Sequence, residues 1–156
     1  MGAPMGEHAG KYLTFALAGE QYGLSVTAVR EIIRMTDITP VPQVPSHVRG
    51  VINLRGKVVP VIDLRLTFGF EQEACTSRTC IIVADVRLGN HRKSMGVIVD
   101  HVSEVLTITR QEIEPMPDVG RDVDTGHLKA LAKVKGAVIV LIDLDRVFGG
   151  RELAIA

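Results

Sequence analysis

The sequence predicts a mainly β protein, built as two five-stranded barrels that are related by internal duplication and carry short helical turns. Its apolar runs are short, rich in Val and Ile, and separated by Gly or Pro, as is typical of strands in a small β fold. One passage also occurs twice. Residues 50–69 and 130–149 align without a gap, and seven of the twenty positions are identical. Two further pairs of segments match in the same order: residues 22–33 with 95–106, and residues 38–45 with 113–120.

The length of the chain, 156 residues, suits one domain made of two halves. Each copy spans about 70 residues, near the size at which a lone core becomes marginal. We therefore expect two subdomains that share apolar surface, drawn from residues 11–75 and 76–149, and the repeat leaves open a strand exchange between them. Residues 1–10 are expected to form a flexible N-terminal tail and residues 150–156 a C-terminal tail.

The first half is expected to open with a hairpin. Apolar and polar residues alternate over residues 12–17 and return over residues 22–26, which indicates two half-buried strands. The period then changes, and residues 27–33 favour one helical turn or a bent strand. Three prolines between residues 40 and 45 predict an extended loop, because each fixes φ and disfavours helix at the residue before it.

A second hairpin is expected to follow this loop. Two apolar runs, residues 48–54 and 57–62, meet at a Gly56 that suits a tight turn with positive φ. Pro60 cannot donate to a ladder, so its strand should lie at an edge or be locally unpaired. Asp63 then suits an N-cap on a short helix over residues 64–68.

The second half is expected to repeat this order. Strands are predicted at residues 80–86 and 95–99, a second proline loop and a polar loop come next, and two more strands are predicted at residues 128–134 and 137–142. Asp143 precedes the last apolar turn as Asp63 does in the first half.

Composition argues against several classes of function. The chain carries 18 basic and 18 acidic residues and six aromatic ones, which suits neither a basic nucleic-acid surface nor a base-stacking platform. It has no apolar stretch of about 18 residues that would span a membrane. Cys75 and Cys80 make no disulfide framework or zinc spacing, so a cytosolic location and no metal or other cofactor are expected.

No catalytic motif stands out, and we expect no enzyme activity. The chain lacks the glycine-rich and nucleophile motifs of nucleotide-binding proteins and hydrolases. Asp63 and Asp143 could be interpreted as a carboxylate pair, but both occupy the same cap position of equivalent copies, and helix capping explains both.

An acid and a base recur together in the two copies. Glu31 and Arg55 of the first copy correspond to Glu104 and Lys135 of the second. Two interpretations remain open: four solvated charges that contribute little to stability, or partly buried pairs that fix the shape of a docking surface.

These segments together resemble the CheW family of bacterial chemotaxis coupling proteins. The resemblance rests on the runs YGLSVTAVREI, ITPVPQVPSHVRGVINLRGKVVPVIDL, MGVIVDHVSEVL and VIVLIDLD, and it covers residues 11–149. It implies two SH3-like five-stranded barrels and a cytoplasmic, non-enzymatic adaptor at receptor arrays of the inner membrane, without insertion into the membrane. The implied partners are the cytoplasmic hairpin tips of chemoreceptors and the regulatory domain of a CheA-type histidine kinase. Alternatives are a paralogue that serves pili or gene regulation, and a nucleic-acid-binding barrel.

The resemblance also implies two sets of site residues. The receptor hairpin would lie in the groove between the subdomains, at the positions Val29, Glu31, Gly50, Asn53, Arg55, Val99, Val102 and Val105. The kinase would contact the bend formed by Met35, Thr36, Asp37, Ile38 and Thr39. The chain departs from the family pattern at Ala130, where a glycine is common.

Overall fold

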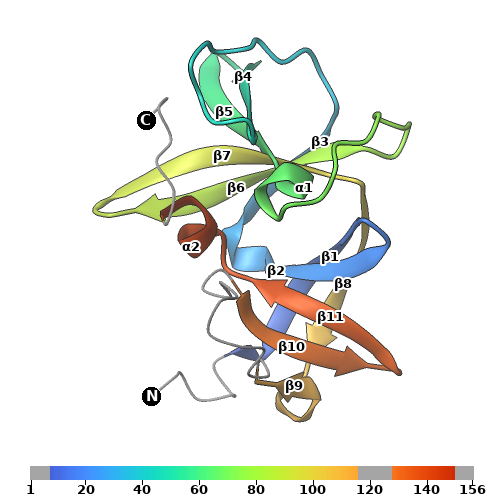
Figure 1. Ribbon diagram of the computed structural model, residues 1–156. Helices are drawn as coiled ribbons and strands as arrows, with labels where there is room; N and C mark the ends of the chain where they lie inside the picture. Colours follow the sequence, from blue (N-terminus) through green and yellow to red (C-terminus); the bar gives the residue numbers. More distant parts are fainter. Residues whose placement is uncertain (1–7, 116–127, 150–156) are drawn as a thin grey trace.

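The computed structural model describes residues 8–115 and 128–149 and consists mainly of β-strands (Figure 1). The predicted tails at residues 1–10 and 150–156 and the predicted polar loop lie wholly or largely outside the described residues. The elements are β1 (Gly10–Leu17), β2 (Glu20–Ser25), β3 (Val29–Arg34), β4 (Val48–Leu54), β5 (Lys57–Asp63), α1 (Leu64–Thr67), β6 (Cys80–Leu88), β7 (His91–Val99), β8 (His101–Ile108), β9 (Ile113–Glu114), β10 (Leu128–Val134), β11 (Ala137–Ile142) and α2 (Leu144–Gly149).

The strands form two sheets. One has six strands in the order β8-β1-β2-β11-β10-β9, and the other has five in the order β3-β6-β7-β5-β4. In Figure 1 the five-stranded sheet lies above the six-stranded one, and the two short helices lie between them. The predicted mainly β class with two strand-rich subdomains and short helical turns is confirmed.

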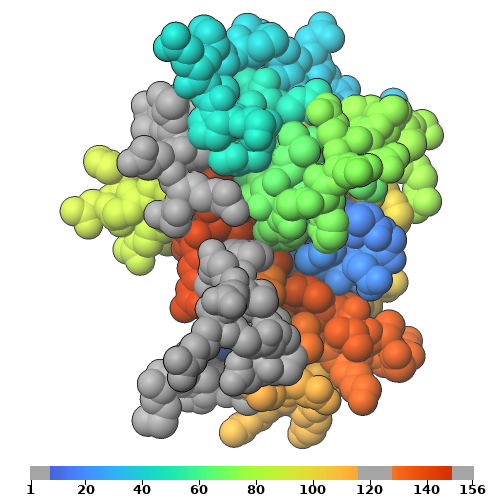
Figure 2. Space-filling view, in the orientation of Figure 1, coloured from blue at the N-terminus to red at the C-terminus, as the bar shows by residue number. Residues whose placement is uncertain are grey.

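The two copies exchange their opening hairpins. The hairpin β1–β2 of the first copy pairs with β8 and β11 of the second, while β6–β7 of the second copy pairs with β3 and β5 of the first. Figure 2 shows the result, because blue residues from near the N-terminus and orange residues from near the C-terminus meet in the lower lobe. A boundary near residue 75 therefore does not separate the sheets, because each sheet is completed by strands of both copies.

The chain crosses between the sheets at two equivalent places. The first crossing is the 3₁₀ turn Val26–Ala28, after β2, and the second is Asp100, between β7 and β8. Thr27 and Asp100 correspond to each other in the repeat. The expected helical turn or bent strand at residues 27–33 is thus a short turn followed by the strand β3.

Each sheet also curls toward its own far edge. The segment after β3 returns to β4, where Thr39 pairs with Val51. In the second copy the equivalent residues Glu114 and Leu131 pair β9 with β10. This contact is a single bridge in one copy and a two-residue strand in the other, which is why the sheets count five and six strands.

Apolar burial joins the two sheets. A central cluster takes residues from both, among them Phe15 of β1, Val97 of β7 and Phe148 of α2, each with 2% or less of its surface exposed. Two smaller clusters each belong to one sheet. The expectation that the subdomains share apolar surface is therefore confirmed, and the shared core holds the sheets against each other.

Local predictions around β5 also hold. Arg55 and Gly56 form the β4–β5 turn with φ values of 51° and 84°. Pro60 lies opposite Val51 of β4, but the pairing of β5 with β7 begins only at Val61, so the ladder with β7 needs no N–H from the proline. The Asp63 carboxylate accepts a hydrogen bond from the backbone N–H of Arg65 and caps α1.

Candidate functional site

A forked ion pair joins β3 to the β4–β5 turn. Arg55 donates from Nη1 to Glu31 Oε1 at 2.9 Å and from Nη2 to Glu31 Oε2 at 2.6 Å. β3 and β4 are the two outer strands of the five-stranded sheet, so the pair spans the opening between its edges. This two-point geometry orients both side chains at the rim of the sheet.

Solvent reaches this pair. The Arg55 side chain is 74% exposed and the Glu31 side chain 23%. The hydrogen bonds from Arg55 lower the pKa of Glu31, and Glu31 in turn raises the pKa of Arg55. Of the two interpretations that the sequence leaves open, the pair does form, but it is an exposed pair that contributes little to stability.

The second copy does not repeat the pair, so that part of the prediction is wrong. No ion pair joins Glu104 and Lys135, both of which the structure describes. Lys135 keeps the left-handed turn conformation of Arg55, with φ at 50°, but lysine lacks the guanidinium fork. Hydrogen bonds from Thr109 lower the pKa of Glu112, and the charge of Lys135 adds to that effect.

Asn53 and Gly50 have structural roles beside this pair. Asn53 Oδ1 accepts a hydrogen bond from Gly56 N at 2.9 Å and so closes the β4–β5 turn. Gly50 has φ of +140°, and a Cβ placed there would overlap the Thr39 carbonyl group, 2.8 Å from its carbon and nearer still to its oxygen. The equivalent Ala130 avoids this conformation, which explains how the second copy accommodates a side chain there.

The groove valines divide into three levels of burial. Val29 on β3 and Val102 on β8 are half-buried against the central cluster. Val105 is 54% exposed on β8. Val99 is 1% exposed, so it supports the wall from beneath and does not line its surface, contrary to expectation. β7 is buried on both faces near its end, so the sequence does not alternate between apolar and polar residues there. The sequence alone therefore does not tell a residue that lines a surface from one that is buried.

Four of the eight predicted groove residues lie on two equivalent edge strands, Val29 and Glu31 on β3 of one sheet and Val102 and Val105 on β8 of the other. The other four belong to β4, its turn and β7, namely Gly50, Asn53, Arg55 and Val99. The structure brings Glu31 and Arg55 into contact, and it connects Val29 with Val102 through the central cluster. The Cys80 thiol of β6 also contacts the other sheet, through a hydrogen bond with the Val102 backbone of β8. Burial raises the pKa of Cys80, and this hydrogen bond opposes that rise.

The bend proposed for the kinase is anchored to the five-stranded sheet. Met35 and Ile38 are half-buried against its small apolar cluster, while Thr36 and Asp37 are exposed. Thr39 exchanges two backbone hydrogen bonds of 2.9 Å with Val51. The bend therefore presents polar groups on a fixed backbone, and its role in binding a kinase stays a prediction.

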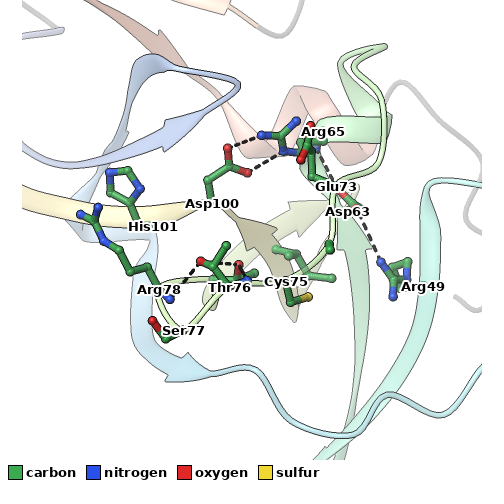
Figure 3. Close-up of a pocket in the computed structure, with 13 residues that line it drawn as sticks. Arg49, Asp63, Arg65, Glu73, Cys75, Thr76, Ser77, Arg78, Asp100 and His101 are labelled. Atoms are coloured by element: carbon green, nitrogen blue, oxygen red, sulfur yellow. Dashed lines mark hydrogen bonds and ion pairs between the residues drawn. The ribbon is translucent and has the colours of Figure 1, made fainter.

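A cavity of about 360 Å³, whose lining residues are mostly polar or charged, lies at the seam between the sheets (Figure 3). Two ion pairs line it. Arg65 of α1 donates to Asp100 from Nε at 2.7 Å and from Nη2 at 2.5 Å, and Arg49 of β4 lies 3.4 Å from Asp63. In Figure 3 the guanidinium of Arg65 points directly at the Asp100 carboxylate. The residues that line the cavity are Arg49, Asp63, Arg65, Glu73, Ala74, Cys75, Thr76, Ser77, Arg78, Thr79, Ile98, Asp100 and His101.

The Asp100 carboxylate also contacts the other sheet. Its Oδ2 accepts a hydrogen bond of 2.9 Å from the backbone N–H of Ala18, in the turn between β1 and β2. Burial raises the pKa of Asp100, but the hydrogen bonds from Arg65 and Ala18 outweigh burial and leave that pKa below its usual value. Asp100 was not among the site residues predicted from the sequence. The one sequence feature that could have pointed to Asp100 is that a charged residue stands where the first copy has Thr27.

Exposed apolar residues are a second feature that was not predicted from the sequence. Val58 of β5 is 71% exposed, and its equivalent Val138 of β11 is 51% exposed. Val58 lines a broad hollow together with basic residues of β3, β5 and β7, namely Arg30, Lys57, Arg92 and Lys93. In both copies a valine follows the turn glycine, Gly56 or Gly136, by two residues. This recurrence shows that the two positions are equivalent, but it does not show that their side chains are exposed.

The described residues, 8–115 and 128–149, offer neither a metal site nor a membrane-spanning helix. Within these ranges no group of three or more His, Cys, Asp or Glu side chains could hold a metal ion. Nor does any helix in the described part have the length and apolar character that a membrane crossing needs.

Comparison with known proteins gives a consistent match. The model of the CheW-like domain family matches residues 11–152. The chemotaxis protein CheW of Rhizobium meliloti is 36% identical over 140 residues, which cover 90% of this chain and 88% of that protein. The CheW of Klebsiella aerogenes is 32% identical over 151 residues, covering 96% and 89%. The crystal structure of the scaffolding protein TtCheW from Thermoanaerobacter tengcongensis superposes with a TM-score of 0.82 at 36% identity, covering 94% of this chain and 98% of that one.

Proposed function

The chain belongs to the CheW-like domain family, and from that premise we propose that it is a non-enzymatic scaffold of chemotaxis signalling. It couples the cytoplasmic hairpin tip of chemoreceptors to a CheA-type histidine kinase. The relatives in Rhizobium and Klebsiella are named as chemotaxis proteins, and the matching solved structure is named as a scaffolding protein.

The observation that carries the receptor side of this proposal is the Glu31–Arg55 fork. It holds two charged groups in fixed positions at the rim of β3, beside the half-buried Val29. An amphipathic helix binds best to an apolar trough that has a few oriented polar groups. Val102 and Val105 supply the corresponding apolar side chains on β8.

The polar residues of the seam support a structural role for Asp63. Its carboxylate caps α1 and pairs with Arg49, and the residue is only 4% exposed. A general base needs a carboxylate that can reach a substrate proton. Asp63 is engaged with its own helix, so the proposal assigns no reaction to the chain.

Co-purification with two defined partners tests the proposal. The chain is mixed with a purified receptor cytoplasmic fragment and with the regulatory domain of a CheA-type kinase. The wild type should retain both. Arg55→Ala should lose the receptor fragment and keep the kinase domain, because it removes the fork without reaching the bend at residues 35–39.

A matched control is Arg110→Ala, which removes an exposed arginine from the 3₁₀ turn Arg110–Glu112 of the other sheet. It should bind both partners as the wild type does. Loss of the kinase alone from Arg55→Ala would show that the two faces are assigned the wrong way round. Failure of the wild type to retain either partner would overturn the proposal.

A further inference from the structure

We propose that Arg65 and Asp100 form a latch which sets the angle at which β8 leaves the seam, and that this latch positions the β8 wall of the receptor groove. The inference rests on the proposed function, because it assigns positioning residues to the receptor site. Neither residue is expected to touch the receptor.

The latch acts at the point where the chain changes sheets. Asp100 is the one residue between β7 of the five-stranded sheet and β8 of the six-stranded sheet. Its backbone N–H donates to the Ala16 carbonyl at 3.1 Å, and its carboxylate accepts from Ala18 N at 2.9 Å. The same carboxylate accepts hydrogen bonds from Arg65 Nε and Nη2, while Arg65 Nη1 donates to the Glu71 carbonyl. A single side chain therefore connects α1, beside the five-stranded sheet, to the first hairpin of the other sheet.

The pair is shielded enough for its geometry to matter. The Arg65 side chain is 17% exposed and the Asp100 side chain 26%. A bidentate pair between a guanidinium and a carboxylate fixes orientation as well as distance, because both hydrogen bonds must be kept together. Turning β8 about the crossing would break at least one of them.

The equivalent crossing has no such latch. Thr27 stands where Asp100 does in the other copy, and its hydroxyl shares a hydrogen bond of 2.9 Å with Ser25. Asp145 stands where Arg65 does, and its carboxylate accepts from the Arg87 backbone N–H at 2.8 Å. The duplication therefore gave two similar crossings, and in the described residues only the one leading into β8 is held by a charged pair.

The groove wall begins immediately after the latch. Val102 follows Asp100 by two residues and Val105 by five, so Val105 lies about 16 Å along the strand. A change of about 10° in the direction of β8 would move Val105 by about 3 Å relative to β3. Binding sites lose function when their geometry is off by about 1 Å, so the latch angle should govern receptor affinity.

Two conservative variants test the latch. Asp100→Asn and Arg65→Gln each remove the ion pair while keeping a polar side chain, and the new amide of Asp100→Asn still offers an oxygen to accept from Ala18. The control is Glu73→Gln, which neutralises another carboxylate of the same cavity that makes no hydrogen bond to Arg65. Affinities are measured by calorimetry for the receptor fragment and for the kinase domain.

Spin-label distances report the angle directly. Labels are placed at Val58→Cys of β5 and at Thr107→Cys of β8, exposed positions on the two sheets, in a Cys75→Ser, Cys80→Ser background. The wild type and Glu73→Gln should give one narrow distance distribution. Asp100→Asn and Arg65→Gln should broaden or shift it and weaken receptor binding about tenfold. Kinase affinity should stay within about twofold, and the double variant should be no worse than either single variant.

The outcomes separate this inference from the proposed function. If the wild type binds the receptor fragment and both variants keep its label distances and its receptor affinity, the latch is overturned. Equal loss of receptor and kinase affinity, together with a lowered melting temperature, would show a general loss of stability and would also overturn it. If the wild type does not bind the receptor fragment, the proposed function fails and the receptor part of the inference fails with it. The distances alone then decide whether the latch sets the angle.

Discussion

Replacing Gly50 by alanine should destabilise the five-stranded sheet at a single known contact. The φ of +140° at this position is one that residues with a Cβ rarely adopt, and the new Cβ would overlap the Thr39 carbonyl group. Because that overlap involves backbone atoms, the segment after β3 must move away from β4. The movement would break the two backbone hydrogen bonds between Thr39 and Val51.

The expected loss follows from these contacts. Two backbone hydrogen bonds contribute about 0.5–1.5 kcal/mol each. Holding a non-glycine residue in this region of φ costs about 1–3 kcal/mol. The free energy of unfolding should therefore fall by about 3 kcal/mol, which lowers the melting temperature by about 10 °C in a chain of this size.

Denaturant and thermal unfolding, followed by circular dichroism, measure this loss. Ala130→Gly is the matched control, because it makes the reverse change at the equivalent position of the second copy, where φ is not positive. It should cost about 1 kcal/mol. If Gly50→Ala were as stable as the wild type, the close approach of the Gly50 and Thr39 backbones would be refuted. Wild-type stability combined with lost receptor binding would make Gly50 a direct contact of the receptor.

Three further outcomes are expected. Glu31→Ala should weaken retention of the receptor fragment more than Glu20→Ala and leave unfolding almost unchanged, because the Glu31–Arg55 pair is open to solvent; equal retention by the two variants would contradict this. Asp63→Ala should lose about 1 kcal/mol of stability with its N-cap, and unchanged urea unfolding would count against capping. Because folding lowers the pKa of Asp100, its contribution to stability is complete above the unfolded value of about 3.9 and is lost as pH falls through the lower folded value. Asp100→Asn should remove that part of the acid transition, and identical acid transitions would argue against it.

Several features of the fold could be predicted because they depend on local chemistry. The turn at Gly56, the cap at Asp63 and the placement of Pro60 each follow from one residue and its neighbours. The duplication was visible because both copies keep the same apolar pattern. A shared core followed from the small size of each copy, and the central cluster bears that out.

The exchange of hairpins could not be decided from the sequence. The hairpins β1–β2 and β6–β7 have similar apolar patterns, and each offers an equivalent edge to β5 or β11. Pairing within a copy and pairing between copies therefore satisfy the same periodicity. The choice depends on the short crossings at Val26–Ala28 and Asp100, which direct each hairpin away from its own copy.

The site predictions missed what depends on long-range packing. Glu104 and Lys135 match Glu31 and Arg55 in type, but an ion pair needs a suitable side-chain geometry that identity of charge does not guarantee. The family resemblance placed Val99 in the groove, and only the packing of both sheets shows it to be buried. Asp100 resembles an ordinary turn residue until Arg65 and Ala18 are found beside it.

Simultaneous binding of two partners is the most direct test of a scaffold. The chain, the receptor fragment and the kinase regulatory domain are each purified and then mixed. The molar mass of the species in the mixture is measured by light scattering coupled to size-exclusion chromatography. A ternary complex is expected, because the receptor is assigned to the Glu31–Arg55 rim and the kinase to other residues, the bend at 35–39. Two binary complexes that displace each other, with no ternary species at saturating concentrations, would contradict it.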